Sequence, residues 1–283
     1  MFVFTAAVVG AGTMGGEIAH SIASADIPVV LKDTAQAPLE VARRRAEGLW
    51  QAQVDAGKLP AAEAERRLSL IRGTTDYSGF GEVDFVIEAV PERMEIKQQV
   101  FSELDAATPG HAILASNTSS LSITEIGEAT MRPDKVVGFH FFYPVSRNRL
   151  IEVTEGEDTS AETAQTAASF AQAIRKLAIR CAEAPGFVVN RVLNAGVTEL
   201  WRAQEQTGID VKEFDRILAE NSPSGYGPFY IADVLGLDTV VAVAEYMQAS
   251  MGERFGVHAR MRELVDAGQV GAKTGRGFYE HSS

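Results

Sequence analysis

Short apolar runs alternate with amphipathic stretches along the first part of the chain. The runs have the length of buried strands and lie at residues 2–9, 27–31, 83–90, 112–115, 136–142, 150–154 and 177–181. The stretches between them repeat apolar residues at helical spacing, and they include residues 18–25, 94–104 and 160–176. This alternation predicts an open parallel sheet with helices on its faces.

A charged, alanine-rich region interrupts the alternation between residues 35 and 71. Its pattern predicts two helices that break near residues 57–60. A crossover between neighbouring strands is usually much shorter, so we expect an inserted helical hairpin. The hairpin carries Arg43, Arg44, Arg45 and Lys58. These cations form either a solvated helix face or a phosphate-binding surface.

Helical spacing dominates after residue 184, and no further strand runs occur. Helices are predicted over residues 187–206, 211–218, 232–250 and 260–267. The sequence therefore predicts two domains, an α/β domain over residues 1–184 and an all-helical domain over residues 185–283.

The first apolar run leads into a glycine-rich turn. Gly10, Gly12 and Gly15 have the spacing Gly-x-Gly-x-x-Gly between a strand and a helix, and Asp33 ends the next strand. Gly10 permits the tight turn, Gly12 lets the backbone approach a pyrophosphate, and Gly15 lets the helix pack on the strand. The helix N-terminus offers N–H groups to the phosphates. These features predict a doubly wound Rossmann-type domain that binds a nicotinamide or flavin nucleotide; the alternative is an ordinary glycine-rich turn.

Asp33 also distinguishes between the two nicotinamide cofactors. Its carboxylate can accept hydrogen bonds from both ribose hydroxyls, but it would repel a 2′-phosphate. Residues 32–35 read Lys-Asp-Thr-Ala and place no arginine directly after it. We therefore expect NAD rather than NADP.

Composition excludes several classes of partner. The chain has 283 residues and a formal net charge of −12, which disfavours nucleic acid and anionic membranes. No apolar run approaches the ~18 residues of a membrane span, and the N-terminal run lacks the basic flank of a signal peptide.

The single cysteine, Cys181, allows no internal disulfide and favours a cytoplasmic location. We expect Cys181 to be a buried small hydrophobe rather than a reactive thiol.

Two polar residues stand alone in apolar strands. His140 lies in the run 136–142 and Glu152 in the run 150–154. A buried imidazole needs a partner, so we expect these two side chains to pair. A carboxylate on one ring nitrogen fixes the tautomer and makes the other nitrogen a better base. Structural or solvated roles are expected for the other histidines, which are His20, His111, His258 and His281.

Seven motifs spread over nearly the whole chain can be compared with known enzymes as a set. They are Gly10–Gly15, Ile87–Glu92, Ser116–Ser120, His140–Phe142, Leu150–Val153, Pro185–Arg191 and Lys273–Tyr279. In order and spacing this set resembles the L-3-hydroxyacyl-CoA dehydrogenase family. The resemblance implies a reversible, NAD-dependent oxidation of a 3-hydroxyacyl-CoA to the 3-oxoacyl-CoA, within fatty acid metabolism.

The resemblance also implies roles for individual residues. It makes His140 the catalytic base and Glu152 its partner, while Ser119 and Asn190 hold the substrate oxygen. The implied cofactor-binding residues are Gly10, Gly12, Thr13, Met14, Gly15, Asp33, Ala89, Val90, Glu92, Lys97 and Asn117. The hairpin with Arg43–Arg45 and Lys58 corresponds to the arm that meets the CoA adenosine phosphate. The helical domain is implied to form a homodimer, and no metal site is expected.

The chain departs from the family pattern just after His140. Tyr143 replaces an asparagine that contacts substrate, and Ser146, Arg147 and Asn148 replace proline or apolar residues near the acyl end. Residues 225–229 also form a shortened motif. We therefore expect a short or polar acyl chain, with Tyr143, Arg147 and Lys58 as candidate substrate contacts. The alternative is that the changed side chains turn away from the acyl group.

Two other functions stay open at this point. One is a dehydrogenase that acts on a polar 3-hydroxyacyl group carried by an acyl carrier protein, or on a free hydroxy acid. The other is a catalytically silent NAD-binding protein, which the presence of Ser119, His140, Glu152 and Asn190 disfavours.

Overall fold

An eight-stranded sheet organises the first part of the chain in the computed structural model, which describes residues 2–222 and 225–281. Its strand order is β3-β2-β1-β4-β5-β6-β7-β8. The strands are β1 (Ala6–Val9), β2 (Val29–Lys32), β3 (Ile71–Thr74), β4 (Phe85–Glu88), β5 (Ile113–Ser116), β6 (Val136–Phe141), β7 (Leu150–Glu155) and β8 (Leu177–Ala182). The contacts divide the chain into two units, Met1–Phe187 and Val188–Ser283, and this sheet belongs to the first.

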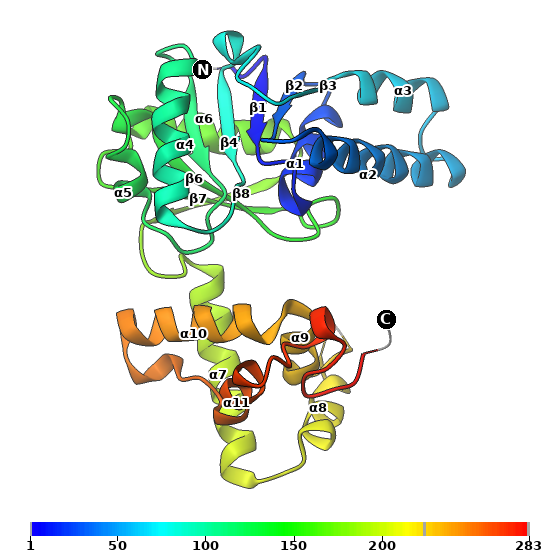
Figure 1. The fold of residues 1–283 in the computed structure, drawn as a ribbon, viewed down its shortest axis with the longest axis vertical. Coiled ribbons are helices and arrows are strands. Elements are labelled where there is room, and N and C mark those ends of the chain that lie inside the picture. Colours follow the sequence, from blue (N-terminus) through cyan, green and yellow to red (C-terminus); the bar gives the residue numbers. More distant parts are fainter. Residues whose placement is uncertain (1, 223–224, 282–283) are drawn as a thin grey trace. The chain divides into compact units, whose positions relative to one another are not determined.

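Helices cover both faces of the sheet (Figure 1). They are α1 (Thr13–Ala23), α2 (Gln36–Asp55), α3 (Ala61–Ser69), α4 (Met94–Ala107), α5 (Ile123–Gly127) and α6 (Ala161–Ala173), with 3-10 turns at Phe80–Glu82 and Pro133–Lys135. Side chains alternate across a strand, so Val8 belongs to the apolar cluster that contains residues of α1 and α6, while Val9 belongs to the cluster that contains residues of α4 and α5. The predicted doubly wound α/β fold is confirmed.

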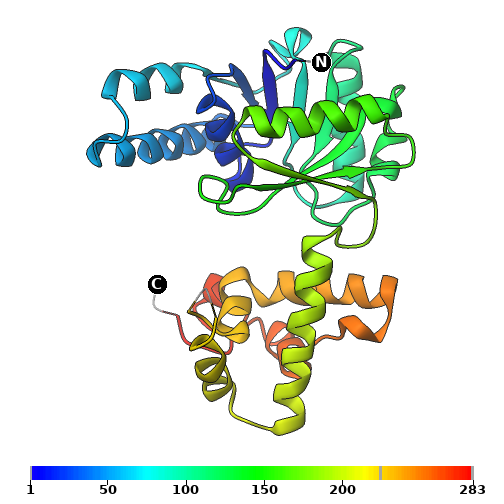
Figure 2. The same cartoon turned by 180° about the vertical axis from the view of Figure 1, so that it is seen from behind.

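The helical hairpin is present where the sequence predicted it. Helix α2 ends at Asp55 and α3 begins at Ala61, and the pair projects from the sheet in both views (Figures 1 and 2). Trp50, near the end of α2, ties the hairpin to α1, because this fully buried ring donates a 3.0 Å hydrogen bond from Nε1 to the hydroxyl of Ser24, the residue after α1.

The predicted sheet is wrong in three details. The first strand begins at Ala6 rather than at residue 2, because the Phe4 and Thr5 N–H groups bind the Asp84 carboxylate instead of a strand. Strand β3 was not predicted, since only Ile71 of this edge strand is buried. Strands β7 and β8 run antiparallel to the others, because the connection between β6 and β7 contains no helix to carry the chain back across the sheet.

The second unit is helical, as predicted. It contains α7 (Val189–Thr207), α8 (Val211–Ala219), α9 (Pro228–Leu235), α10 (Leu237–Met251) and α11 (Ala259–Asp266), with 3-10 turns at Glu253–Phe255 and Ala272–Thr274. One helix was predicted over residues 232–250, but the chain forms two. Gly236 separates them with a φ of 97°, a left-handed conformation that glycine adopts readily.

Two buried carboxylates hold this unit together. Asp215 accepts hydrogen bonds from the Phe229 and Tyr230 N–H groups, and Asp233 accepts them from Phe278 and Tyr279. These bonds tie the last residues of the unit to α8 and α9.

Cys181 is half-buried rather than buried, because β8 lies at the edge of the sheet. Burial nevertheless raises the pKa of its thiol, which keeps it protonated and unreactive. Within the described part of the chain, no helix has the length and apolar character needed to cross a membrane.

Candidate active site

The glycine-rich turn joins β1 to α1 at the carboxyl edge of the sheet. Gly10 has a φ of 98°, and a side chain there would meet the Ala89 carbonyl oxygen at 2.6 Å. A side chain on Gly15 would lie 1.7 Å from the Gly10 carbonyl oxygen. Both glycines are therefore required by close backbone approach, as the sequence predicted.

Gly12 is different, because no atom of the described residues, apart from its own chain neighbours, lies within 4 Å of the position a side chain would take. It is the N-cap of α1, and no side chain caps the helix there. Thr13 and Met14 follow in the first turn, where backbone N–H groups lack helical partners. The open space and the positive end of the helix dipole together fit a pyrophosphate.

Asp33 follows β2 and faces the same turn. Its Oδ2 accepts the Ala11 N–H at 2.7 Å, and its Oδ1 accepts the Thr34 N–H at 2.7 Å. The Thr34 hydroxyl also lies 3.4 Å from Oδ1. A carboxylate has about four acceptor positions, so Oδ2 keeps a free position for a ribose hydroxyl. These residues fit the adenosine end of NAD.

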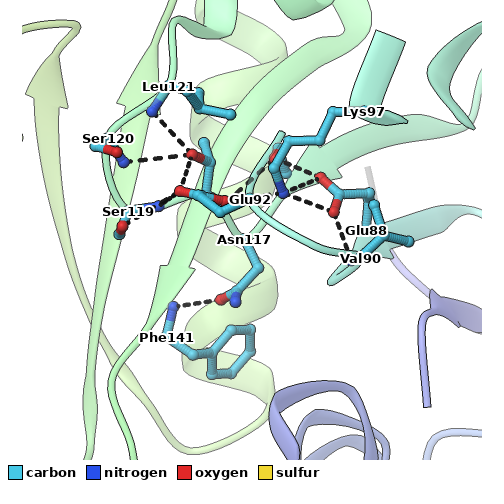
Figure 3. A network of polar contacts seen from close by, with 11 residues as sticks. Glu88, Val90, Glu92, Lys97, Asn117, Ser119, Ser120, Leu121 and Phe141 are labelled. Carbon is cyan, nitrogen blue, oxygen red and sulfur yellow. Dashed lines mark hydrogen bonds and ion pairs between the residues drawn. The ribbon is translucent and has the colours of Figure 1, made fainter. Parts of the chain in front are cut away.

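A buried ion pair lies behind the end of β4. Lys97 on α4 is 1% exposed, and its ammonium lies 2.7 Å and 3.0 Å from the two carboxylate oxygens of Glu88. Glu88 also accepts hydrogen bonds from the Val90 N–H and the Ser116 hydroxyl. Glu88 has no exposed surface. Its hydrogen bonds to the Val90 N–H and the Ser116 hydroxyl hold the segments that leave the sheet after β4 and β5 (Figure 3).

The same lysine holds a second carboxylate at the rim of the site. Its ammonium lies 3.1 Å from Glu92, whose side chain is 40% exposed. The other Glu92 oxygen accepts the Thr118 hydroxyl at 2.6 Å and the Ser119 N–H at 2.8 Å. Burial by itself raises the pKa of the Glu92 carboxyl, but the Lys97 charge and these hydrogen bonds lower it below its usual value. Glu92 is therefore an anion at neutral pH.

Ser119 and Asn117 follow β5 in this network. The Ser119 hydroxyl lies 3.2 Å from Glu92, and the Asn117 side-chain oxygen accepts the Phe141 N–H at 2.9 Å. Asn117 thereby joins the segment after β5 to the end of β6 (Figure 3).

His140 and Glu152 are paired, as predicted. They are register partners on β6 and β7, and His140 Nδ1 lies 2.8 Å from a Glu152 carboxylate oxygen. His140 is 7% exposed, and Glu152 is fully buried. An ionised carboxylate only accepts hydrogen bonds, so Nδ1 carries the proton and Nε2 has a free lone pair. Within the described part of the chain, Nε2 has no hydrogen-bond partner.

The loop after β6 contacts the first two helices. Glu17 on α1 is 2% exposed; it pairs with Arg45 at 2.8 Å and accepts the Ser146 N–H. Arg45 also donates a 3.1 Å hydrogen bond to the Tyr143 hydroxyl. Of the three hairpin arginines, Arg45 is therefore bound to other side chains of the protein rather than free to bind a phosphate.

The other candidate substrate contacts lie elsewhere. Lys58 is exposed in the turn between α2 and α3, and Arg43 and Arg44 are exposed on α2. Arg147 lines a cavity with His20 and Lys176. Asn190 lies in the first turn of α7, in the second unit, where its carbonyl accepts a hydrogen bond from Asn194.

Comparison with known proteins places both parts of the chain. Residues 5–184 match the domain described as 3-hydroxyacyl-CoA dehydrogenase, NAD binding domain, and residues 186–281 match the C-terminal domain of the same enzymes. The chain belongs to the 3-hydroxyacyl-CoA dehydrogenase family. The predicted cofactor, NAD, is confirmed by this match.

Several relatives of the 3-hydroxyacyl-CoA dehydrogenase family align with almost all of this chain. It is 36% identical over 277 residues to a 3-hydroxybutyryl-CoA dehydrogenase of Clostridioides difficile, covering 98% of this chain and 99% of the relative. It is 39% identical over 280 residues to the fatty acid oxidation complex subunit alpha of Psychrobacter cryohalolentis, but spans only 38% of that protein. The crystal structure of (S)-3-hydroxybutyryl-CoA dehydrogenase from Ralstonia eutropha superposes over both whole chains with a TM-score of 0.94 at 34% identity.

Two buried glutamates of this family member, Glu88 and Glu17, were not predicted to take part in the site. The role of Glu88 could have been predicted, since it is a lone charged residue near the end of the apolar run 83–90. The role of Glu17 could not, because a glutamate on a helix is ordinarily solvent-exposed. Only the fold shows that the loop after β6 covers Glu17.

Proposed function

We propose that the protein oxidises the hydroxyl group of a short-chain (S)-3-hydroxyacyl-CoA to the 3-oxo group, reversibly and with NAD. The observation that carries this proposal is the buried His140–Glu152 pair, at the carboxyl end of β6 in an NAD-binding fold. Two relatives that match the chain over their full length at 34–36% identity are named as 3-hydroxybutyryl-CoA dehydrogenases, which favours a CoA thioester over an acyl carrier protein or a free acid. A diketoreductase that also matches over its full length is less similar, at 28% identity.

His140 is the general base of the proposed reaction. Its Nε2 takes the proton of the substrate hydroxyl as the C3–O bond becomes a carbonyl. Bound NAD supplies the acceptor for the hydride that leaves C3. Glu152 holds the Nδ1 proton throughout and balances the positive charge that develops on the ring.

Ser119 and Asn190 are proposed to hold the substrate oxygen. The Ser119 hydroxyl and N–H both lie near Glu92, which supports a fixed orientation for that side chain. Asn190 is supported only by its match to the family motif at Pro185–Arg191. Its part in catalysis is a prediction from the sequence.

The cofactor contacts follow two patterns. Gly10, Gly12, Thr13, Met14, Gly15 and Asp33 are proposed to hold the adenosine and pyrophosphate. Ala89, Val90, Glu92 and Asn117 are proposed to line the nicotinamide end. Lys97 was predicted as a direct contact, but its 1% exposure supports a positioning role in which it holds Glu92.

The chain length and assembly are finer parts of the proposal. A short acyl chain is supported by the polar residues after β6, where Arg45 binds the hydroxyl of the exposed Tyr143. A homodimer through the C-terminal domain is supported by exposed apolar side chains of that unit, which include Val192, Leu193, Val234 and Leu235. A cytoplasmic location is proposed from the lone cysteine.

The direct test is NADH oxidation with acetoacetyl-CoA, followed by absorbance. We expect saturable turnover that requires His140 and that is faster with NADH than with NADPH. Turnover of acetoacetyl groups only when they are attached to an acyl carrier protein would reject the CoA substrate. No turnover of these thioesters or of free acetoacetate, with intact NADH binding, would favour the catalytically silent alternative.

A further inference from the structure

A cavity of about 250 Å³ lies among helices α1, α2 and α3, the loop after β6 and the end of α6. Six of its lining side chains are basic: His20, Arg67, Arg147, Arg149, Arg175 and Lys176. Among the described residues that line it, none is an aspartate or a glutamate. Such a concentration of positive charge is unexpected in a chain with a formal net charge of −12.

Most of these charges have no counterion. Arg67 lies 2.9 Å from Glu63 and 3.7 Å from Asp26. In the described ranges, the other three arginines and Lys176 have no carboxylate at ion-pair distance. Lys176 instead donates hydrogen bonds to the carbonyl oxygens of Val145 and Asn148 in the loop after β6.

His20 independently points to a ligand site in this cavity. Its ring packs 4.5 Å from the Trp50 ring, is 5% exposed and lines the cavity. Neither ring nitrogen has a hydrogen-bond partner among the described residues. Burial, with the nearby charges of Lys176 and Arg67, lowers its pKa to about 4. A buried donor without an acceptor is unfavourable, and an anion in the cavity would supply one.

Arg175 ends α6 in a conformation that is uncommon for residues other than glycine. It follows α6 with a φ of 61°, in the left-handed region where glycine is favoured. The Arg175 N–H donates to the Gln172 carbonyl and the Lys176 N–H to the Ala171 carbonyl, which is a common way for a helix to end. This ending places the Arg175 guanidinium at the cavity.

We propose that this cavity binds a phosphate group. Guanidinium groups match the oxygens of phosphate, and a phosphate carries more charge and more acceptors than a carboxylate. Since a water molecule takes about 30 Å³, the space admits one or two phosphoryl groups with bound water. The Ser21 and Ser24 hydroxyls also line it. No residue proposed above for the base, its partner or NAD lines the cavity.

The test uses the neighbouring tryptophan as the reporter. The chain has two tryptophans, so Trp201→Phe leaves Trp50 as the only one. Inorganic phosphate and pyrophosphate are titrated at constant ionic strength with chloride, and Trp50 fluorescence is recorded. We expect a saturable change with either anion. A response that does not saturate, or that chloride reproduces, overturns the proposal.

Two variants link the response to the cavity. Arg175→Gly removes a charge while relieving the backbone, so it should weaken phosphate binding about tenfold without lowering the melting temperature. Arg180→Gln is the matched control, because Arg180 is an exposed arginine that pairs with Glu155 on β7 and lies outside the cavity. It should bind phosphate like the parent. Equal affinity in Arg175→Gly contradicts the proposal.

Competition identifies the source of the phosphate. If CoA displaces the bound anion and 3′-dephospho-CoA does not, the group is the CoA 3′-phosphate. If neither displaces it, the ligand is a free phosphate or pyrophosphate. Both results support a phosphate site. The readout is fluorescence and not turnover, so a failure of the proposed dehydrogenase activity is recognised separately.

Discussion

Two buried acid–base pairs involve residues of the same sheet, Glu88 on β4 and His140 with Glu152 on β6 and β7, and they differ in one respect. In the Glu88–Lys97 pair the carboxylate meets Lys97, the Val90 N–H and the Ser116 hydroxyl, so its acceptor positions are filled. In the His140–Glu152 pair the ring uses Nδ1 and leaves Nε2 without a partner among the described residues. A pair whose hydrogen-bonding positions are all filled stabilises the fold, whereas a pair that leaves the Nε2 lone pair free can accept a proton from a substrate.

The strongest test of this contrast is His140→Ala. A positioned general base is worth about 10²–10⁴ in rate, so kcat should fall by that factor. The NADH dissociation constant, measured by fluorescence, should stay near the parent value because His140 is not proposed to bind the cofactor. Retention of more than about a tenth of kcat would remove His140 from its proposed role.

Lys97→Met tests the other pair. It leaves the buried Glu88 carboxylate without its counterion, which typically costs about 3–5 kcal/mol in the free energy of unfolding. Urea denaturation should show this loss, and adding Glu88→Gln should recover part of it. An unchanged unfolding midpoint in Lys97→Met would mean that the pair does not stabilise the fold.

Asp33→Ala extends the contrast to a carboxylate that uses two acceptor positions on backbone N–H groups and keeps one on Oδ2 free. A hydrogen bond to a charged group contributes about 1.5–3 kcal/mol, so the KM for NAD should rise roughly tenfold or more. The parent should have a higher kcat/KM with NAD than with NADP. An equal or higher value with NADP would contradict the assigned role.

Glu152→Gln sharpens the contrast within the catalytic pair. The side-chain oxygen of glutamine can still accept a hydrogen bond from the His140 Nδ1–H group, but it carries no negative charge. A neutral hydrogen bond is weaker than a charged one by about 1–1.5 kcal/mol, so kcat should fall about tenfold, less than in His140→Ala. A loss as large as that of His140→Ala would indicate that the charge, and not the position of the ring, dominates.

The smallest expected effect concerns the acyl chain. An apolar pocket gains about 0.8 kcal/mol for each CH₂ it buries, and the polar residues after β6 should not provide that gain. Across a series of 3-oxoacyl-CoA substrates of increasing length, kcat/KM should stay level or fall beyond the shortest. A steady rise would show that Tyr143 and its neighbours turn away from the acyl group.

Much of the fold and part of the site followed from local patterns. The glycine turn, Asp33, the hairpin break and the pairing of His140 with Glu152 were all predicted, because each depends on residues whose spacing sets their geometry. Strand β3 was missed because three of its four residues are not buried and gave no apolar run. The split at Gly236 was missed because an isolated glycine in a helical pattern is often tolerated.

The sequence alone determined the class of this protein: periodicity specifies the strands and helices, and the glycines and Asp33 specify the nucleotide turn, because these signals are local. Apart from the His140–Glu152 pair, the tertiary structure alone decided which charges meet. Glu17 reaches Arg45 and the loop after β6, Lys97 lies beneath Glu92, and six basic residues from four separate segments line one cavity. Such pairings arise from contacts between segments far apart in the chain, and packing brings these segments together without leaving a pattern in any one of them.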